Sequence, residues 1–200
     1  MDIELREPIS DLVGAYPDRA LLVCGSARCL WDDLAKIKPE LYDIMAVNFT
    51  GLFYPDKVTH WVSGYSHLLK HWRGLRWESG WVVKTGFKEK EPLITHGRNL
   101  MEGVDHAWSW RDMGQGTSTL DAAMIGVLMG YNHVILAGAP LDKTGHFYDP
   151  PGYNSGDQQP DYWDGIIKVW KLWKDRGVLE NVKSLSGNTR KILGAPVGLH

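Results

Sequence analysis

Short apolar segments alternate with amphipathic segments along most of this chain, which predicts a sheet covered by helices. The apolar runs are typical of strands buried on both faces, and the other segments have helical spacing with capping residues or glycine at their ends. The order of these elements predicts an α/β fold, a three-layer Rossmann-like domain with a mostly parallel central sheet. The predicted strands cover residues 20–25, 42–48, 58–63, 81–83, 93–95, 104–110, 134–138 and 182–185. The predicted helices cover residues 30–37, 68–72, 120–129, 162–176 and 186–194.

Length and composition limit what the chain can be. Its 200 residues with 44% apolar composition fit one domain over 1–200, with a lead-in at 1–18 and a loop of lid-like composition at 152–160. The formal net charge of −2 gives no overall basic field, so duplex nucleic acid is not predicted as a partner. Cys24 and Cys29 do not form a CxxC pattern, so neither a disulfide framework nor a zinc site is predicted. No segment reaches membrane-spanning length, which predicts a cytoplasmic protein without a membrane partner and leaves a homo-oligomer open.

Glycine or polar residues follow several predicted strands at the point where each strand ends. Ligands bind outside the carboxyl ends of open α/β sheets, so these residues are candidates for a binding site. Gly25 would let a ligand approach the backbone, and the helix start after it could direct N–H groups at an anion. Asn48 could donate to a base, a ribose or a phosphate, or simply close its strand in an Asx turn. Further candidates at strand ends are Ser26, Ser63, Tyr65 and Gly138, while His96-Gly97-Arg98-Asn99 could line a pocket or be a solvated loop.

The segment from Asp142 to Asp149 lies just past the apolar strand at 134–138, where chemistry is expected. His146 is the candidate acid or base because imidazole titrates nearest to neutral pH, and Asp142 or Asp149 could orient or charge it. The alternative is an ordinary polar turn in which His146 satisfies a neighbouring carbonyl. Side chains that could contact phosphate oxygens here, or from the first helix, are Lys143, Tyr148 and Arg28.

Three pieces of the chain, in this order, carry a resemblance to a known group. They are a strand followed by Gly25-Ser26-Ala27-Arg28-Cys29-Leu30, a strand ending in Asn48, and Thr117-Ser118 opening a helix that leads to GYNHVILAGAPLD and HFYD. Over roughly residues 20–150 the chain resembles the small bacterial CMP-sialic acid-dependent sialyltransferases and the wider Rossmann-like group that includes 6-hydroxymethylpterin diphosphokinase-like proteins. The first turn of those families is typically Gly-x-Gly-Pro-Ser-Leu, of which this chain keeps Gly25 and Leu30. The closing SLSGNTRKILGAP also resembles the ends of phage-encoded proteins, which implies a viral source and the host cytoplasm.

The resemblance implies a nucleotide pocket and, more finely, a transferase that uses a nucleotide-sugar. Asn48 matches an asparagine that contacts the nucleotide, and Thr117-Ser118 match a Thr-Ser pair near the cytidine. Tyr148 and His146 fall at or beside tyrosines that hold the leaving phosphate in the sialyltransferases.

Two alternatives to glycosyl transfer follow from the same resemblance. The pterin-kinase side of the group implies pyrophosphoryl transfer, in which Asp142 and Asp149 would bind Mg²⁺ with water and phosphate. The general-base histidine of the sialyltransferases lies in a later lid that we do not identify in this sequence. A non-catalytic nucleotide-binding or sequestering protein is therefore the other alternative.

Overall fold

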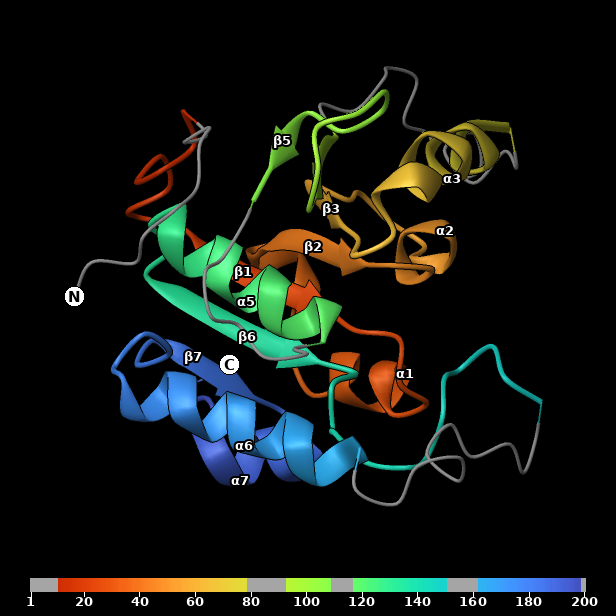
Figure 1. The fold of residues 1–200 in the computed structure, drawn as a ribbon. Helices are drawn as coiled ribbons and strands as arrows, with labels where there is room; N and C mark the ends of the chain where they lie inside the picture. Colours follow the sequence, from red (N-terminus) through yellow and green to blue (C-terminus); the bar gives the residue numbers. More distant parts are fainter. Residues whose placement is uncertain (1–10, 79–92, 109–116, 151–161, 199–200) are drawn as a thin grey trace.

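The computed structural model describes residues 11–78, 93–108, 117–150 and 162–198. They form a sheet with helices on both faces (Figure 1), so the predicted three-layer Rossmann-like α/β fold is confirmed. The strands are β1 Ala20–Cys24, β2 Asp43–Val47, β3 His60–Val62, β4 Ile94–Gly97, β5 His106–Ala107, β6 His133–Ala137 and β7 Val182–Ser184. The helices are α1 Leu30–Leu34, α2 Thr50–Phe53, α3 Ser66–Glu78, α5 Ser118–Leu128, α6 Tyr162–Asp175 and α7 Gly187–Leu193, with a 3-10 turn η1 at Pro39–Leu41.

The order of the strands along the sheet reverses direction at one position. The order is β5-β4-β3-β2-β1-β6-β7, and all strand pairs among the described residues are parallel. The chain adds strands outward from β1 to β5 and then returns to the other side of β1 with β6. In open α/β sheets, the crevice at such a reversal is the usual ligand-binding position. The carboxyl ends of β1 and β6 are therefore where a site is expected.

Most predicted elements are present, with changes at their ends. The first helix ends at Leu34 rather than at Ile37, and α2 was not predicted. The strand predicted at 104–110 is reduced to the two residues of β5 in the described part, and the one predicted at 81–83 lies outside it, as does the loop at 152–160. The helix predicted at 120–129 is confirmed as α5, which has Thr117 as its N-cap and is followed by Gly130 at φ +87°.

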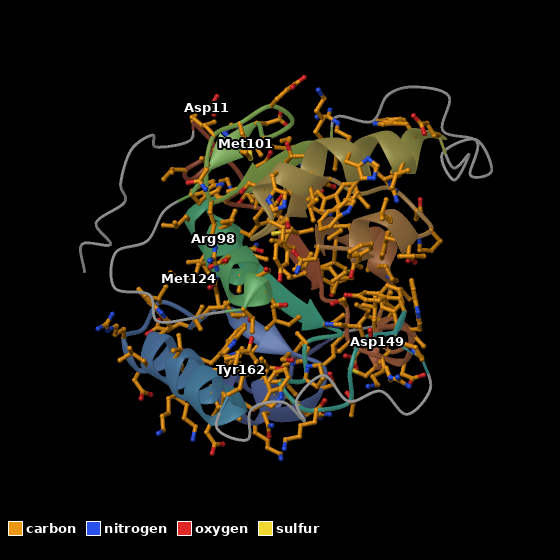
Figure 2. The ribbon with its side chains drawn as sticks, turned by 45° about the vertical axis from the view of Figure 1, so that its right-hand side comes forward. Asp11, Arg98, Met101, Met124, Asp149 and Tyr162 are labelled. Carbon is orange, nitrogen blue, oxygen red and sulfur yellow. The ribbon has the colours of Figure 1, made fainter. Side chains whose placement is uncertain are left out.

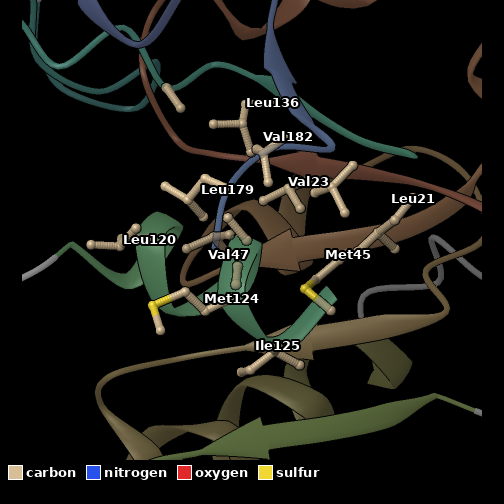
Figure 3. Close-up of a cluster of buried hydrophobic side chains, with 14 of the residues drawn as sticks. Leu21, Val23, Met45, Val47, Leu120, Met124, Ile125, Leu136, Leu179 and Val182 are labelled. Carbon is tan, nitrogen blue, oxygen red and sulfur yellow. The ribbon is translucent and has the colours of Figure 1, made fainter. Parts of the chain in front are cut away.

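Two apolar layers, one on each face of the sheet, hold these elements together. Helices α5 and α6 cover one face, and α1, α2 and α3 cover the other. Figure 3 shows side chains of the first layer, in which Leu120, Met124 and Ile125 of α5 belong to one buried cluster with Val23 of β1. Gly126 lets α5 approach closely, because a Cβ there would lie 2.6 Å from Leu21 Cδ2. None of the described helices combines the length and apolar character needed to cross a bilayer.

A chain of buried polar side chains crosses the face under α5, from the edge strands toward the amino ends of the central strands. Trp108 Nε1 donates to His96 Nδ1 at 3.0 Å, and His96 Nε2 lies 3.0 Å from His60 Nδ1. His60 Nε2 lies 2.9 Å from the Tyr131 hydroxyl, which donates to Asp43 at 2.8 Å. Since the indole can only donate, each neutral histidine must accept at Nδ1 and donate from Nε2. The hydrogen bonds therefore all point the same way, from Trp108 to Asp43.

Candidate functional site

A cavity of about 720 Å³ opens at the carboxyl edge of the sheet, beside the reversal between β1 and β6. Its walls come from the loops after β1, β2, β3, β4 and β6 and from the starts of α5 and α6. The described residues that line it are Ser26, Ala27, Val47, Asn48, Gly64, Tyr65, Arg98, Thr117, Ser118, Thr119, Gly138, Ala139, Pro140, Leu141, Asp142, Gly145, His146, Tyr162 and Trp163.

Glycines allow the ends of β1 and β6 to touch at the bottom of this cavity. Gly25 N donates to Ala137 O at 2.8 Å, and Ala27 N donates to Gly138 O at 3.0 Å. A Cβ on Gly25 would lie 2.4 Å from Gly138 O, so any larger residue would push the two loops apart. In this structure it is therefore another loop, rather than the cavity, that approaches the Gly25 backbone. Gly138, at φ +63°, does line the cavity.

Two residues hold the cavity wall in a strained backbone conformation. Asn48 has φ +50° and Leu141 has φ +52°, and no other non-glycine residue in the described ranges has a positive φ. A left-handed conformation costs a non-glycine residue about 1–3 kcal/mol and is concentrated at functional sites. Both residues line the cavity, so the strain is located where a ligand would bind.

The side chain of Asn48 is held with its donor group available. Its Oδ1 accepts a hydrogen bond from Ser63 Oγ at 2.9 Å, and Ser63 Oγ accepts one from Tyr65 N at 2.9 Å. Trp61 Nε1 donates to the Asn48 carbonyl at 2.7 Å and fixes the backbone. Within the described residues, the Asn48 Nδ2 group has no acceptor. Ser63, predicted as a ligand contact, instead positions Asn48 from outside the cavity.

His146 lines the cavity and lies against Ser26 and Tyr148. Its Nδ1 lies 3.0 Å from Ser26 Oγ, and its ring is stacked on the Tyr148 ring with centroids 5.0 Å apart. Burial raises the pKa of the Tyr148 hydroxyl, and a hydrogen bond from Ser26 acts in the opposite direction. When Ser26 donates to Nδ1, His146 carries its proton on Nε2, and when Ser26 accepts, Nε2 is a free base. The pair can therefore present either an acid or a base.

The loop that carries this wall is fixed from behind by α1 and α7. Buried Asp33 accepts hydrogen bonds from Gly138 N at 3.0 Å and from Ser186 Oγ at 2.7 Å. Thr189 Oγ1 donates to Ala139 O at 2.6 Å, and Asn188 Nδ2 donates to Leu141 O at 2.9 Å. The polar group at 186–189 thus supports the cavity wall without lining it.

The contacts of Asp33 predict that its charge stabilises the fold. Changing Asp33→Asn keeps the shape, but it replaces one of the two oxygens that accept from Gly138 N, Ser186 and Lys36 by a buried amide NH2, which then faces a donor in place of an acceptor. A buried donor left without its acceptor costs about 1–3 kcal/mol. We expect urea unfolding to show a loss of this size. The matched control is Asp32→Asn, at an exposed carboxylate on the same helix, which should change the free energy of unfolding by less than about 0.5 kcal/mol. Equal effects of the two changes would contradict this role.

Eight of the fourteen residues proposed from the sequence line the cavity: Ser26, Asn48, Tyr65, Thr117, Ser118, Gly138, Asp142 and His146. The others lie around it in supporting or outer positions. Asp149 accepts a hydrogen bond from His146 N at 2.7 Å, so its carboxylate holds the backbone rather than the imidazole. Arg28 donates to Pro150 O and lies outside the cavity lining, and Lys143 is exposed outside it. Gly25, Ser63 and Tyr148 contact lining residues.

Both carboxylates proposed for Mg²⁺ accept a hydrogen bond from a backbone N–H of their own loop. Asp142 accepts from Thr144 N at 3.0 Å, and Asp149 accepts from His146 N. The described residues contain no group of three or more side chains that could together ligate a metal. A magnesium site formed by these two carboxylates with water and phosphate stays a prediction.

Some lining residues were not predicted from the sequence. Tyr162 and Trp163 open α6 and lie at the cavity. Their position depends on how α6 packs on the sheet, which periodicity does not show. Of the four residues His96-Gly97-Arg98-Asn99, which could have lined a pocket, Arg98 is among the described lining residues and the other three are not. That loop carried a usable signal, a polar residue directly after a strand.

Comparison with known proteins extends this picture at the level of the fold. No protein-family model and no curated protein matches the chain. The sialyltransferase CstII from Campylobacter jejuni, in a crystal structure with a trisaccharide acceptor and CMP, aligns with a TM-score of 0.59 at 12% identity, over 88% of this chain and 86% of that one. The α-2,3-sialyltransferase Cst-I from Campylobacter jejuni aligns with a TM-score of 0.56 at 14% identity, over 98% of this chain and 85% of that one. The predicted similarity to sialyltransferases is thus confirmed for the fold.

Proposed function

We propose that this chain is a nucleotide-dependent transferase of the glycosyltransferase type, with a nucleotide-sugar bound in the carboxyl-edge cavity. The observation that carries the proposal is the meeting of Asn48, Thr117-Ser118 and His146 in one cavity at the strand reversal. The same fold in CstII was solved with CMP and with CMP-3FNeuAc, which supports a cytidine nucleotide as the first ligand to test.

The walls of the cavity offer donors that suit a nucleotide. Asn48 Nδ2 can donate to a base or ribose oxygen, since Ser63 already occupies its Oδ1. Ser118 and Thr119 form the first turn of α5, and both line the cavity. The first N–H groups of a helix lack partners within the helix and carry partial positive charge, so they favour a phosphate.

His146 is the group proposed to move the proton in the transfer. The acceptor hydroxyl oxygen would bond to the anomeric carbon while the bond from that carbon to the phosphate oxygen breaks. The electron pair of that bond leaves with the nucleoside phosphate, and the acceptor proton passes to His146 Nε2. Ser26 supports this step by accepting a hydrogen bond from Nδ1–H, which leaves Nε2 unprotonated and able to take the proton. The leaving charge would lie near the α5 start.

Nucleotide binding is the first measurement that tests the proposal. Thermal unfolding should be followed with CMP, CDP, UDP and ATP and with their sugars. A ligand at a hundred times its Kd stabilises the folded state by about 2.7 kcal/mol, so a rise in Tm is expected with at least one of them. No shift with any nucleotide would overturn the proposal. Binding without measurable transfer or donor hydrolysis would instead identify a sequestering protein.

A substitution in the cavity makes this measurement specific. Asn48→Asp keeps a residue that tolerates the left-handed backbone and replaces the free donor by a negative charge. The Tm shift with nucleotide should then be lost. Asn132→Asp, at an exposed position away from the cavity, is the matched control and should keep it.

A further inference from the structure

One permanent positive charge faces the cavity from the wall opposite His146. We propose that Arg98 binds the anionic group of the ligand, a phosphate or a sugar carboxylate, and so selects charged over neutral ligands. This inference rests on the proposed function, because it assigns a substrate class to the same cavity. Figure 2 shows Arg98 beside α5, while Asp149, in the loop that carries His146, lies on the other side of the view.

The choice of Arg98 follows from the charges at the cavity. Among the lining residues within the described ranges, Arg98 is the one lysine or arginine. The cations expected from the sequence to contact phosphate, Arg28 and Lys143, lie outside the lining. A charged ligand taken out of water needs a compensating charge, since unpaired ionised groups are costly to bury. For an anion in this cavity, Arg98 is the group that can supply it.

The guanidinium is held in a fixed position by a buried carboxylate. Arg98 Nη2 and Nε donate to Asp121 Oδ2 at 2.9 and 3.3 Å, and Arg98 N donates to Ser66 Oγ at 2.9 Å. The Asp121 side chain is 6% exposed and the Arg98 side chain 52%. The negative charge therefore lies behind the positive one, and the cavity faces the cation. The guanidinium keeps its Nη1 edge for a ligand, and a planar fork of this kind suits phosphate or carboxylate oxygens.

The anion would meet this guanidinium beside the start of α5. Gly64, which follows β3, lines the cavity together with Arg98 and Ser118. A Cβ at Gly64 would lie 3.1 Å from Ser118 Oγ and 3.8 Å from Arg98 Cζ, so the absence of a side chain lets the loop after β3 lie close to both residues. A cation and a helix start, which both favour negative charge, therefore border the same part of the cavity. Arg98, Gly64 and Ser118 together form what we call the anion subsite.

The test compares ligand pairs that differ by one charge. In the unmodified protein CMP should bind more tightly than cytidine, or CMP-3FNeuAc more tightly than its carboxylate methyl ester. The double substitution Arg98→Gln with Asp121→Asn removes the cation together with the charge of the carboxylate that holds it. It should reduce the preference for the charged member of one pair about 10- to 100-fold, as expected for a hydrogen bond between charged groups. Affinity for the neutral member should change little.

The outcomes separate the two sources of the anion and the two proposals. Loss of the CMP preference assigns Arg98 to the phosphate, and loss of the CMP-3FNeuAc preference assigns it to the sugar carboxylate. If both preferences persist in the variant, the anion subsite is overturned while the proposed function stands. If the unmodified protein binds no nucleotide, the proposed function fails first. Arg73→Gln, on α3 and outside the cavity lining, is the control that should leave both preferences unchanged.

Discussion

Replacing His146 by alanine is expected to lower turnover at least about 100-fold while nucleotide affinity stays within a few-fold. The reason is the position of the imidazole, which lines the cavity and is held at Nδ1 by Ser26. A group that moves a proton in the transition state contributes to the rate and adds little to ground-state binding. Initial rates of sugar transfer or donor hydrolysis, with the Kd of the nucleotide measured in parallel, separate the two effects.

Two further variants make the result for His146 interpretable. Ser26→Ala removes the partner of Nδ1 and should lower turnover less than His146→Ala, because the imidazole itself remains. His133→Ala changes an exposed histidine at the amino end of β6, far along the strand from the cavity, and should leave turnover unchanged. Unchanged turnover in His146→Ala would remove this residue from the mechanism. A parallel loss of nucleotide affinity would show that His146 binds the nucleotide rather than moves the proton.

The fold could be predicted because each central strand has a recognisable apolar run in the sequence. The runs that became β1 and β6 are apolar on both faces and are followed by Gly25 and Gly138, so their type and their ends were legible. The ends of the short edge strand β5 were not, because a strand was predicted over 104–110 and two half-buried residues carry no periodicity that could fix its bounds. Helix α2 is a single turn between β2 and β3, which is too short to show a hydrophobic period of 3.6 residues.

The position of the site could be predicted from the sequence, but the contacts between its side chains could be predicted less well. Parallel strands bring their carboxyl ends to one edge, so Ser26, Asn48 and His146 were expected together, and they are. Which side chain holds which depends on distances that sequence spacing does not give. Asp149 was a candidate to orient the imidazole, yet its carboxylate accepts from the backbone N–H of His146. The hydrogen bond from Ser186, just before α7, to Asp33 joins residues that are 153 positions apart. No pattern in the local sequence could have predicted this contact.

The buried histidines on the α5 face make a second large effect predictable, a loss of stability in acid. Burial lowers the pKa of His60 to about 3, helped by the charges of Arg19 and His106. Burial also lowers the pKa of His96 well below its ordinary value, with His60 and His106 adding to the effect. Both rings are fully buried and neutral in the chain of hydrogen bonds that runs to Tyr131 and Asp43. A proton on Nδ1 of either ring would set two donors against each other and break a hydrogen bond in that chain.

The sign follows from which state binds the protons. A histidine in the unfolded chain titrates at about pH 6.5. Below that pH His60 and His96 each bind a proton in the unfolded chain and stay neutral in the folded one. The free energy of unfolding should therefore fall by about 2.7 kcal/mol per pH unit as the pH drops from 6 toward 4.5, before most carboxylates titrate. Urea unfolding at a series of pH values measures this slope. His96→Asn should reduce this slope to about half, because only one histidine that stays neutral in the folded state remains. This expectation holds whatever the substitution does to the free energy of unfolding at neutral pH. His71→Gln, at an exposed histidine of α3, should leave the slope as it is. A flat profile between pH 6 and 4.5 in the unmodified protein would mean that the rings accept protons in the folded state, and the one-way chain of hydrogen bonds would then be wrong.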